Sequence, residues 1–307
     1  MLTTGGYAER LFLLRNRFNK GKDRMLREYA KALTKRVDTR ALMQFKPPTL
    51  PSRIYTKTLC IDNAHYGKYC EEVKWGRVDT LHPLYLQMLS LPLQMQCLLD
   101  KKSPFPLLGL IHAANNIIIH DDIDISEPLE CRVKFSDVRP HSKGWDVDIE
   151  LTALQGGSCV YTAVSTYLVR VKAVHVAPRA PVISNEFLCD GSDSALIDTL
   201  SITNDTGRKY AKISGDYNPI HLYGLTAKLF GFKKPIAHGM WTLANAVSSL
   251  ANATDKSFYR IDCRFKRPVF LPANVDVITE CFTEENVKLS IVGQKNKEPH
   301  VECSISF

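Results

Sequence analysis

The sequence predicts an α+β protein made of two similar halves, each with a long helix followed by antiparallel strands. Proline and small polar residues cluster at residues 46–52 (KPPTLPS) and 176–194 (VAPRAPVISNEFLCDGSDS), which marks two boundaries. An apolar stripe at helical spacing is present in the block after each boundary, and strict period-two alternation follows it. A helix laid on an antiparallel sheet in each half would cover the apolar faces of both elements.

In the first block, residues 49–172, we expect a helix from His82 to about Asp100 (HPLYLQMLSLPLQMQCLLD), kinked or broken at Pro92. Residues 129–135 and 145–151 then alternate apolar with polar side chains, as half-buried strands do. Residues 159–171 (CVYTAVSTYLVRV) are rich in β-branched and aromatic side chains and predict a third strand.

The second block, residues 199–307, repeats this plan after a linker expected at residues 173–198. Its helix is predicted to begin near Ile236, directly after Pro235, because proline is favoured at helix starts. Alternation follows at residues 259–265, 287–291 and 301–307. The repeated order of elements predicts a duplication, although residue identity between the blocks is slight.

Length and composition indicate a globular intracellular protein. A chain of 307 residues with 45% hydrophobic content can form about two domains. No apolar run approaches the roughly 18 residues of a membrane span, and the start of the chain lacks a secretory signal, so we expect a cytoplasmic protein. Because the cysteines are odd in number and widely spaced, we expect reduced, mostly buried thiols. They are Cys60, Cys70, Cys97, Cys131, Cys159, Cys189, Cys263, Cys281 and Cys303.

The net charge of +8 belongs to an N-terminal arm, residues 1–48. Residues 1–46 contain twelve Lys and Arg against four acids, so the remaining chain is neutral overall. Outside the arm, the chain therefore has no overall positive electrostatic potential that would attract nucleic acid. Apolar residues at helical spacings predict that the arm is a helix, packed on the body or in peripheral contact with an anionic membrane or a partner.

The segment ISGDYNPIHLYGLTAKLFGFKKPIAHGM, residues 213–240, contains turn formers that explain Gly215, Asn218 and Pro219 but not its histidines. GDYNPIH (215–221) matches the hydratase 2 signature G-D-x-N-P-[apolar]-H, and KKPIAHGM (233–240) matches the segment that follows it. The chain thus resembles the MaoC-like dehydratases, or R-specific enoyl-CoA hydratases. The resemblance is strong over residues 199–280. It implies a double hotdog fold, in which each half wraps a sheet around a central helix.

The resemblance implies reversible hydration of trans-2-enoyl thioesters, here enoyl-CoA, to (R)-3-hydroxyacyl thioesters without a metal or redox cofactor. Such chemistry needs proton transfer to and from water and carbon, and donors for an enolate-like oxygen. By resemblance, Asp216 and His221 hold the water and share the proton transfers, and the N–H of Gly239 forms the oxyanion hole. Asn218 would fix the turn, and His238 would line the pocket or orient the loop. On spacing alone, these residues could instead be structural histidines and a turn cap.

The first half lacks the motif, so we expect it to be non-catalytic and to shape the acyl-binding tunnel through its helix. Where relatives often have an acidic residue after the motif histidine, this chain has Leu222, Tyr223 and Gly224, which affects the expected loop shape.

Two charged clusters are weaker candidates. The cations Arg264, Lys266 and Arg267 could contact the phosphates of coenzyme A or form a solvated strand face. His120, Asp122 and Asp124 could share one face of a strand as metal ligands, although we expect no metal there.

Three alternatives stay open from the sequence. The enzyme could act as a 3-hydroxyacyl-ACP dehydratase of fatty acid synthesis, with the basic arm docking an acidic acyl carrier protein. The same fold also occurs in thioesterases, which need a different arrangement at the carbonyl. An inactive hotdog binding protein is the third alternative. Since one chain already contains a pseudo-dimer, both a monomer and a homodimer are expected states.

Overall fold

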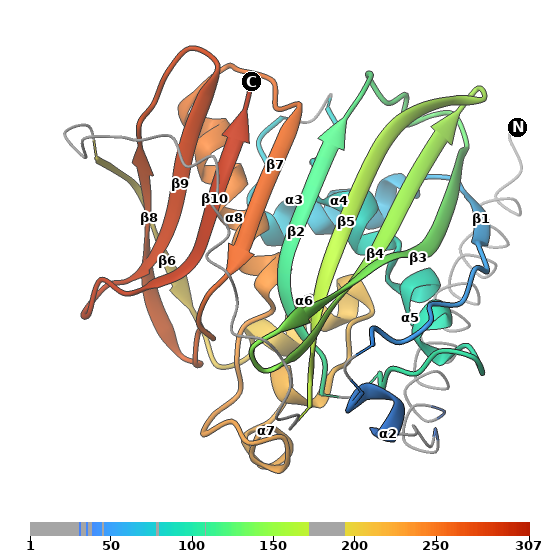
Figure 1. Ribbon diagram of the computed structural model, residues 1–307. Coiled ribbons are helices and arrows are strands. Elements are labelled where there is room, and N and C mark those ends of the chain that lie inside the picture. Colours follow the sequence, from blue (N-terminus) through green and yellow to red (C-terminus); the bar gives the residue numbers. More distant parts are fainter. Residues whose placement is uncertain are drawn as a thin grey trace, which may run out of the picture.

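The computed structural model describes residues 31, 35, 39–44, 46–77, 80–107, 109–171 and 194–307. Within them a ten-stranded antiparallel sheet curves around the central helices, which lie on one of its faces (Figure 1). The strands are β1 (Tyr55–Leu59), β2 (Ile111–Ile119), β3 (Leu129–His141), β4 (Gly144–Gln155), β5 (Ser158–Arg170), β6 (Ala195–Ile202), β7 (Arg260–Phe265), β8 (Ala273–Glu280), β9 (Asn286–Gly293) and β10 (Pro299–Ser306). The helices are α2 (Thr39–Leu42), α3 (Asn63–Val73), α4 (Tyr85–Leu89), α5 (Leu91–Leu99), α6 (Thr206–Ser214), the 3-10 helix η1 (Pro219–His221), α7 (Gly224–Leu229) and α8 (Gly239–Ala253).

The strand order shows that one architecture is used twice. The sheet runs β1-β3-β4-β5-β2-β7-β10-β9-β8-β6. When the strands of each half are numbered one to five along the chain, both halves have the order 1-3-4-5-2 from the outer edge inward. Apart from α2, which precedes β1, the helices of each half lie between its first and second strands. This is the double hotdog fold that the sequence predicts.

The two halves meet at the centre of the sheet, where β2 pairs with β7 from Ala114↔Arg264 to Ile118↔Arg260. Side chains of the first half also bind the backbone around α8. Arg77 donates to the carbonyls of Ala251 (2.9 Å) and Lys256 (2.7 Å), and His82 Nε2 lies 3.2 Å from the carbonyl oxygen of Ala244. The halves therefore share backbone and side-chain hydrogen bonds as well as a sheet.

The alternating pattern of the sequence produces the buried face of the sheet. In the second half, Ile261 and Cys263 of β7 and Leu289 of β9 are at most 3% exposed. They pack in one apolar cluster with Leu243 and Val247 of α8. Burying one such side chain contributes about 1.5–3 kcal/mol, so this pattern is the main determinant of the strand register.

The first predicted central helix is broken near Pro92, as expected, whereas the second begins later than predicted. The predicted helix 82–100 is two helices, α4 and α5, which meet at Ser90 because Pro92 cannot continue the helical hydrogen bonding. The helix predicted to begin near Ile236 begins at Gly239. Its expected first turn is extended instead, because Ile236 bridges to Phe270 and the N–H of Ala237 donates to Val269 O (2.9 Å).

Most of the predicted arm, 1–48, and linker, 173–198, lies outside the described residues, so their roles stay predictions. The described part of the linker contains the start of β6 at Ala195. Lys35 of the arm contacts the body, since its Nζ donates to the carbonyls of Ser103 and Phe105, both at 3.0 Å. No helix in the described ranges is long and apolar enough to cross a membrane.

The thiols are not all reduced. Cys281 is disulfide-bonded, which contradicts the prediction from cysteine spacing. The cysteines described as free are Cys60, Cys70, Cys97, Cys131, Cys159, Cys263 and Cys303, of which Cys60 and Cys159 are exposed.

Candidate active site

The motif GDYNPIH forms a tightly bonded connection after α6. Gly215 ends the helix in the left-handed region, at φ 74°, which a residue with a side chain rarely adopts. Asp216 Oδ1 then accepts from the N–H of Asn218 (3.1 Å), and Asn218 Oδ1 accepts from the N–H of Ile220 (3.4 Å). These two successive Asx turns, followed by Pro219 at the start of η1, direct the chain back so that His221 lies near Asp216.

His221 is held on two sides. Its Nδ1 lies 2.9 Å from the carbonyl oxygen of Ile236, so Nδ1 carries a proton and donates it. Its backbone packs against α6 at Gly207, where a Cβ would lie only 2.0 Å from His221 O. In the neutral ring, Nε2 is therefore the nitrogen with a free lone pair, and it can accept a proton.

His238 completes the group. Its Nε2 lies 3.0 Å from the backbone oxygen of Asp216 and 3.8 Å from the Asp216 carboxylate. Its ring stacks on that of His221, with 3.7 Å between centroids and 27° between planes, and meets Tyr210 edge-on. His238 Nδ1 is buried without a hydrogen-bond partner in the described part of the chain. His238 thus fixes the position of both Asp216 and His221.

Burial keeps the histidines neutral. Loss of solvation lowers the pKa of His221, against the opposing influence of the Asp216 charge and the Ile236 carbonyl. Burial, reinforced by His221, lowers the pKa of His238 to about 3. Near neutral pH, two uncharged imidazoles therefore lie beside the Asp216 carboxyl group, with one polar atom of each residue within 4.8 Å of the others.

Gly239 is the first residue of α8, and His238 is its N-cap. The N–H groups of a first helical turn have no partner within the helix, and the positive end of the helix dipole lies there. A Cβ on Gly239 would lie 2.8 Å from two ring carbons of Phe265, so glycine is required for this packing. The position suits a donor to a developing negative oxygen.

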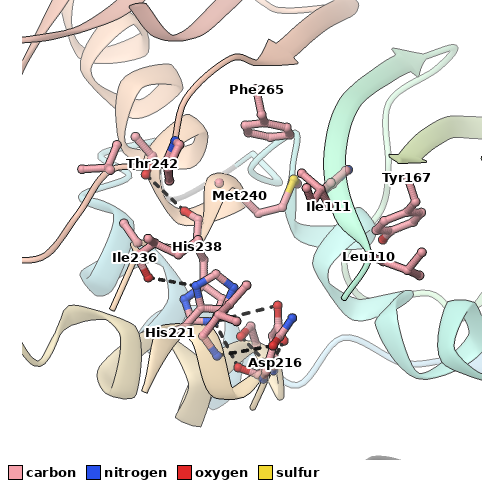
Figure 2. A pocket seen from close by; sticks show the side chains of 18 of the residues that line it. Leu110, Ile111, Tyr167, Asp216, His221, Ile236, His238, Met240, Thr242 and Phe265 are labelled. Atoms are coloured by element: carbon pink, nitrogen blue, oxygen red, sulfur yellow. Dashed lines mark hydrogen bonds and ion pairs between the residues drawn. The ribbon is translucent and has the colours of Figure 1, made fainter. Parts of the chain in front are cut away.

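These residues open onto one cavity of about 380 Å³ that both halves line. Figure 2 shows Asp216, His221 and His238 together on one side, with Leu110, Ile111 and Tyr167 of the first half across from them. As predicted, the helical region of the first half lines the cavity. It does so through Gln87, Met88, Leu91, Gln94, Met95 and Leu98.

Several cavity residues were missed by the sequence analysis. His112 and Tyr167, which stack with 4.9 Å between ring centroids, line the cavity from β2 and β5. Burial lowers the pKa of His112 to about 4, partly offset by the nearby Asp216 charge. No local motif marks these residues, because they approach the site only through the pairing of the two halves.

The predicted phosphate contacts lie in different places. Lys266 and Arg267 line the cavity, and each forms an ion pair, with Glu302 (2.8 Å) and Glu298 (2.9 Å) respectively. Arg264 is not among the lining residues. Phe265 lines the cavity, and since neighbours on a strand point to opposite faces, Arg264 points to the other side of the sheet.

The side chains of His120, Asp122 and Asp124 do not come together as a possible metal-ligand group. His120 Nε2 lies 2.9 Å from Thr162 Oγ1, and the Asp124 carboxylate accepts from Ser126, with both residues exposed. In the described ranges, the group whose side chains are close enough to share an ion is instead Asp216, His221 and His238.

The fold and the site define a double hotdog protein with its hydratase 2 motif in the second half. Residues 192–302 match the family described as "MaoC like domain". The 3-hydroxyacyl-thioester dehydratase X of Mycobacterium tuberculosis is 32% identical over 227 residues, covering 73% of this chain and 79% of the relative. The chain therefore belongs to the MaoC-like dehydratase family, a family of hydro-lyases.

Solved structures agree with this assignment. The crystal structure of HtdX from M. tuberculosis aligns with a TM-score of 0.70 at 26% identity, covering 82% of this chain and 99% of that one. A MaoC-like dehydratase from Phytophthora capsici shares the fold, with a TM-score of 0.69 at 18% identity over 88% of this chain and 98% of that one. A short match, 39% over 77 residues (24% of each chain), is to the peroxisomal enoyl-CoA hydratase 2 of Arabidopsis thaliana.

Proposed function

We propose that the protein catalyses the reversible hydration of trans-2-enoyl-CoA to (R)-3-hydroxyacyl-CoA. The observation that supports this most directly is the convergence of Asp216, His221 and the start of α8 on one apolar-walled cavity. Relatives named as 3-hydroxyacyl-thioester dehydratase and enoyl-CoA hydratase 2 support the same reaction. Adding water changes no oxidation state, so acid–base groups suffice and the proposal needs no metal or redox cofactor.

In the proposed mechanism, Asp216 and His221 hold a water molecule between them. The water oxygen bonds to C3 and loses one proton to the pair, while the pair returns one proton to C2. The pair thus ends the cycle with the protons it had at the start. His221 Nε2 suits the accepting step, because Nδ1 is committed to Ile236 O.

The thioester oxygen gains negative charge as C3 is attacked. The N–H of Gly239 at the start of α8 would donate to this oxygen, aided by the helix dipole. In acyl-transfer enzymes, removing one oxyanion-hole donor lowers kcat by roughly 10²–10³-fold. Asn218 and His238 act as positioning residues, since the N–H of Asn218 donates to the Asp216 carboxylate and His238 Nε2 lies 3.0 Å from the Asp216 backbone oxygen.

Coenzyme A, as part of the substrate, would place its phosphates near Lys266 and Arg267 at the cavity wall. Their ion-pair partners Glu302 and Glu298 weaken this attraction without removing it, since all four side chains are substantially exposed. Arg264 is left out of this role, because it is not among the residues that line the cavity. The competing carrier is an acyl carrier protein, whose acidic surface would have to bind outside the cavity.

The test is the loss of enoyl absorbance when purified protein meets a short and a medium trans-2-enoyl-CoA, with the product configuration determined by chiral chromatography. We expect turnover that Asp216→Asn or His221→Ala each reduces by at least about 10²-fold. His120→Ala, which alters an exposed histidine, is the matched control and should retain full activity. Equal activity in the site variants and the control would exclude the proposed site. Turnover restricted to acyl-carrier-protein substrates would identify a dehydratase of the other carrier class.

A further inference from the structure

The cavity wall in the first half contains two glutamines that an apolar acyl tunnel does not require. Gln87 of α4 and Gln94 of α5 are 4% and 3% exposed, and both line the cavity. We call them the amide pair. They lie seven residues apart on two successive helices, with the lining residue Leu91 between them in the sequence.

The two amides differ in their hydrogen bonding. Gln94 is satisfied at both atoms, since its Oε1 accepts from Tyr167 Oη (2.7 Å) and its Nε2 donates to Ser90 Oγ (2.6 Å). Gln87 Nε2 donates to Ser165 Oγ, but Gln87 Oε1 is buried with no partner in the described residues. A buried amide oxygen without a hydrogen bond is unfavourable and is rare in native proteins.

Rotation of the Gln87 amide does not remove this deficit. Ser165 Oγ also accepts from Asn115 Nδ2 (3.1 Å), and Asn115 Oδ1 is likewise buried without a partner among the described residues. If the Gln87 amide were turned over, Ser165 could donate to it, and a buried N–H would then be unpaired instead. In either orientation one polar atom of Gln87, a residue that lines the cavity, has no hydrogen-bond partner among the described residues.

We propose that Gln87 of the amide pair binds a hydroxyl group on the acyl chain, so that the substrates are hydroxylated enoyl thioesters. This inference rests on the proposed function and names its substrate class. A hydroxyl can both donate and accept, so it pairs with Gln87 in either amide orientation. The apolar residues Leu91, Met95 and Leu98 line the cavity beside the amides and would contact the methylene groups of the same chain.

The unpaired polar atom of Gln87 predicts a preference for hydroxylated over plain alkyl chains. A plain alkyl chain that passes Gln87 leaves its free polar atom desolvated, whereas a chain with a hydroxyl at the right distance pairs with it. We test this with matched pairs of trans-2-enoyl-CoA from six to twelve carbons, each made with and without a terminal hydroxyl. At one chain length at least, kcat/KM should be about tenfold higher for the hydroxylated member. An equal or lower kcat/KM for the hydroxylated member at every length would overturn the proposal.

Two variants of Gln87 isolate the role of the amide. Gln87→Leu and Gln87→Met, which remove the amide and keep an apolar side chain of similar length, should bring the ratio of the two kcat/KM values close to one or below. Gln96→Leu in the following helix, α5, is the matched control, because the Gln96 amide donates to its own helix at Pro92 O (3.2 Å) and Gln96 does not line the cavity. A Gln87 variant with the same ratio as this control would contradict the proposal.

A binding measurement separates this inference from the proposed function. Saturated acyl-CoA has no double bond to hydrate, so calorimetry with saturated pairs, with and without the hydroxyl, requires no turnover. We expect wild-type protein to bind the hydroxylated member more tightly and Gln87→Leu to lose the difference. If the protein turns over a four-carbon enoyl-CoA but shows no preference for the hydroxylated member of any longer pair, only the proposed substrate class is overturned. A hydroxyl preference in binding without turnover of any substrate would overturn only the proposed reaction.

Discussion

At the scale of single residues, the chemistry of the site depends on which polar atoms are already hydrogen-bonded and which are not. His221 hydrogen-bonds through Nδ1 to the backbone carbonyl of Ile236, and His238 hydrogen-bonds through Nε2 to the backbone oxygen of Asp216. These bonds select the tautomer of each neutral ring and leave His221 Nε2 free for chemistry. The sequence motif identified Asp216 and His221 as the catalytic candidates. The tautomers of the two histidines depend on the backbone oxygens of Ile236 and Asp216, and no sequence pattern identifies these acceptors.

Gly239→Ala tests the oxyanion position. The added methyl group would lie 2.8 Å from the Phe265 ring and force either the ring or the helix start to move. Because the N–H donor would be displaced from the thioester oxygen, we expect kcat/KM to fall by about 10²-fold, measured by enoyl absorbance. Gly67→Ala, with open space around the new methyl group, is the control. Equal kinetics for the two variants would argue against a role for this N–H.

At the scale of elements, the strongly alternating strands and the helix α8 were predictable, and the weakly patterned elements were not. β2 has the sequence IHAANNIII, in which two asparagines and two alanines hide the alternation, so the sequence analysis missed it. The short helix α6 and the edge strands β1 and β6 were also missed. Because β2 holds His112 and pairs with β7, missing it also meant missing the opposite wall of the cavity.

The contact between α6 and η1 gives an element-scale prediction. In Gly207→Ala, the new methyl group would lie 2.0 Å from His221 O, so η1 must move away from α6. We expect the free energy of unfolding to fall by about 1–3 kcal/mol and kcat/KM to fall as His221 shifts. Urea unfolding and enoyl kinetics measure the two effects. Gly224→Ala, whose methyl group would meet only Pro235 Cδ at 4.0 Å, is the control, and similar losses in both variants would refute the packing argument.

At the scale of the whole molecule, the two halves contribute different parts of the candidate site. The second half contains the motif, while the first half supplies β2, β5 and the α4–α5 wall of the cavity. The sequence analysis predicted this division from the single copy of the motif. It could not predict how the halves touch, because contacts such as His82 to Ala244 join residues far apart in the chain.

Acid stability tests this junction. His82 is fully buried between the halves, and burial lowers its pKa to about 3. The unfolded chain therefore binds a proton below about pH 6.5 that the folded protein does not, so stability is full above that pH and falls as pH drops. His82→Gln should remove roughly 1.4 kcal/mol per pH unit from the slope of unfolding free energy between pH 6 and 5. Urea titrations of wild type, His82→Gln and the exposed control His120→Gln measure it, and equal slopes would contradict the assignment.

The central claim is that Asp216 and His221 act as one catalytic unit on an enoyl thioester. The most direct test is a double-mutant cycle on kcat/KM for a short trans-2-enoyl-CoA, with Asp216→Asn, His221→Ala and the combined variant. If the pair shares its proton transfers, each single change removes most of the activity and the double variant is within about tenfold of either single one. Losses that multiply in the double variant would show that the residues act independently and would contradict the account.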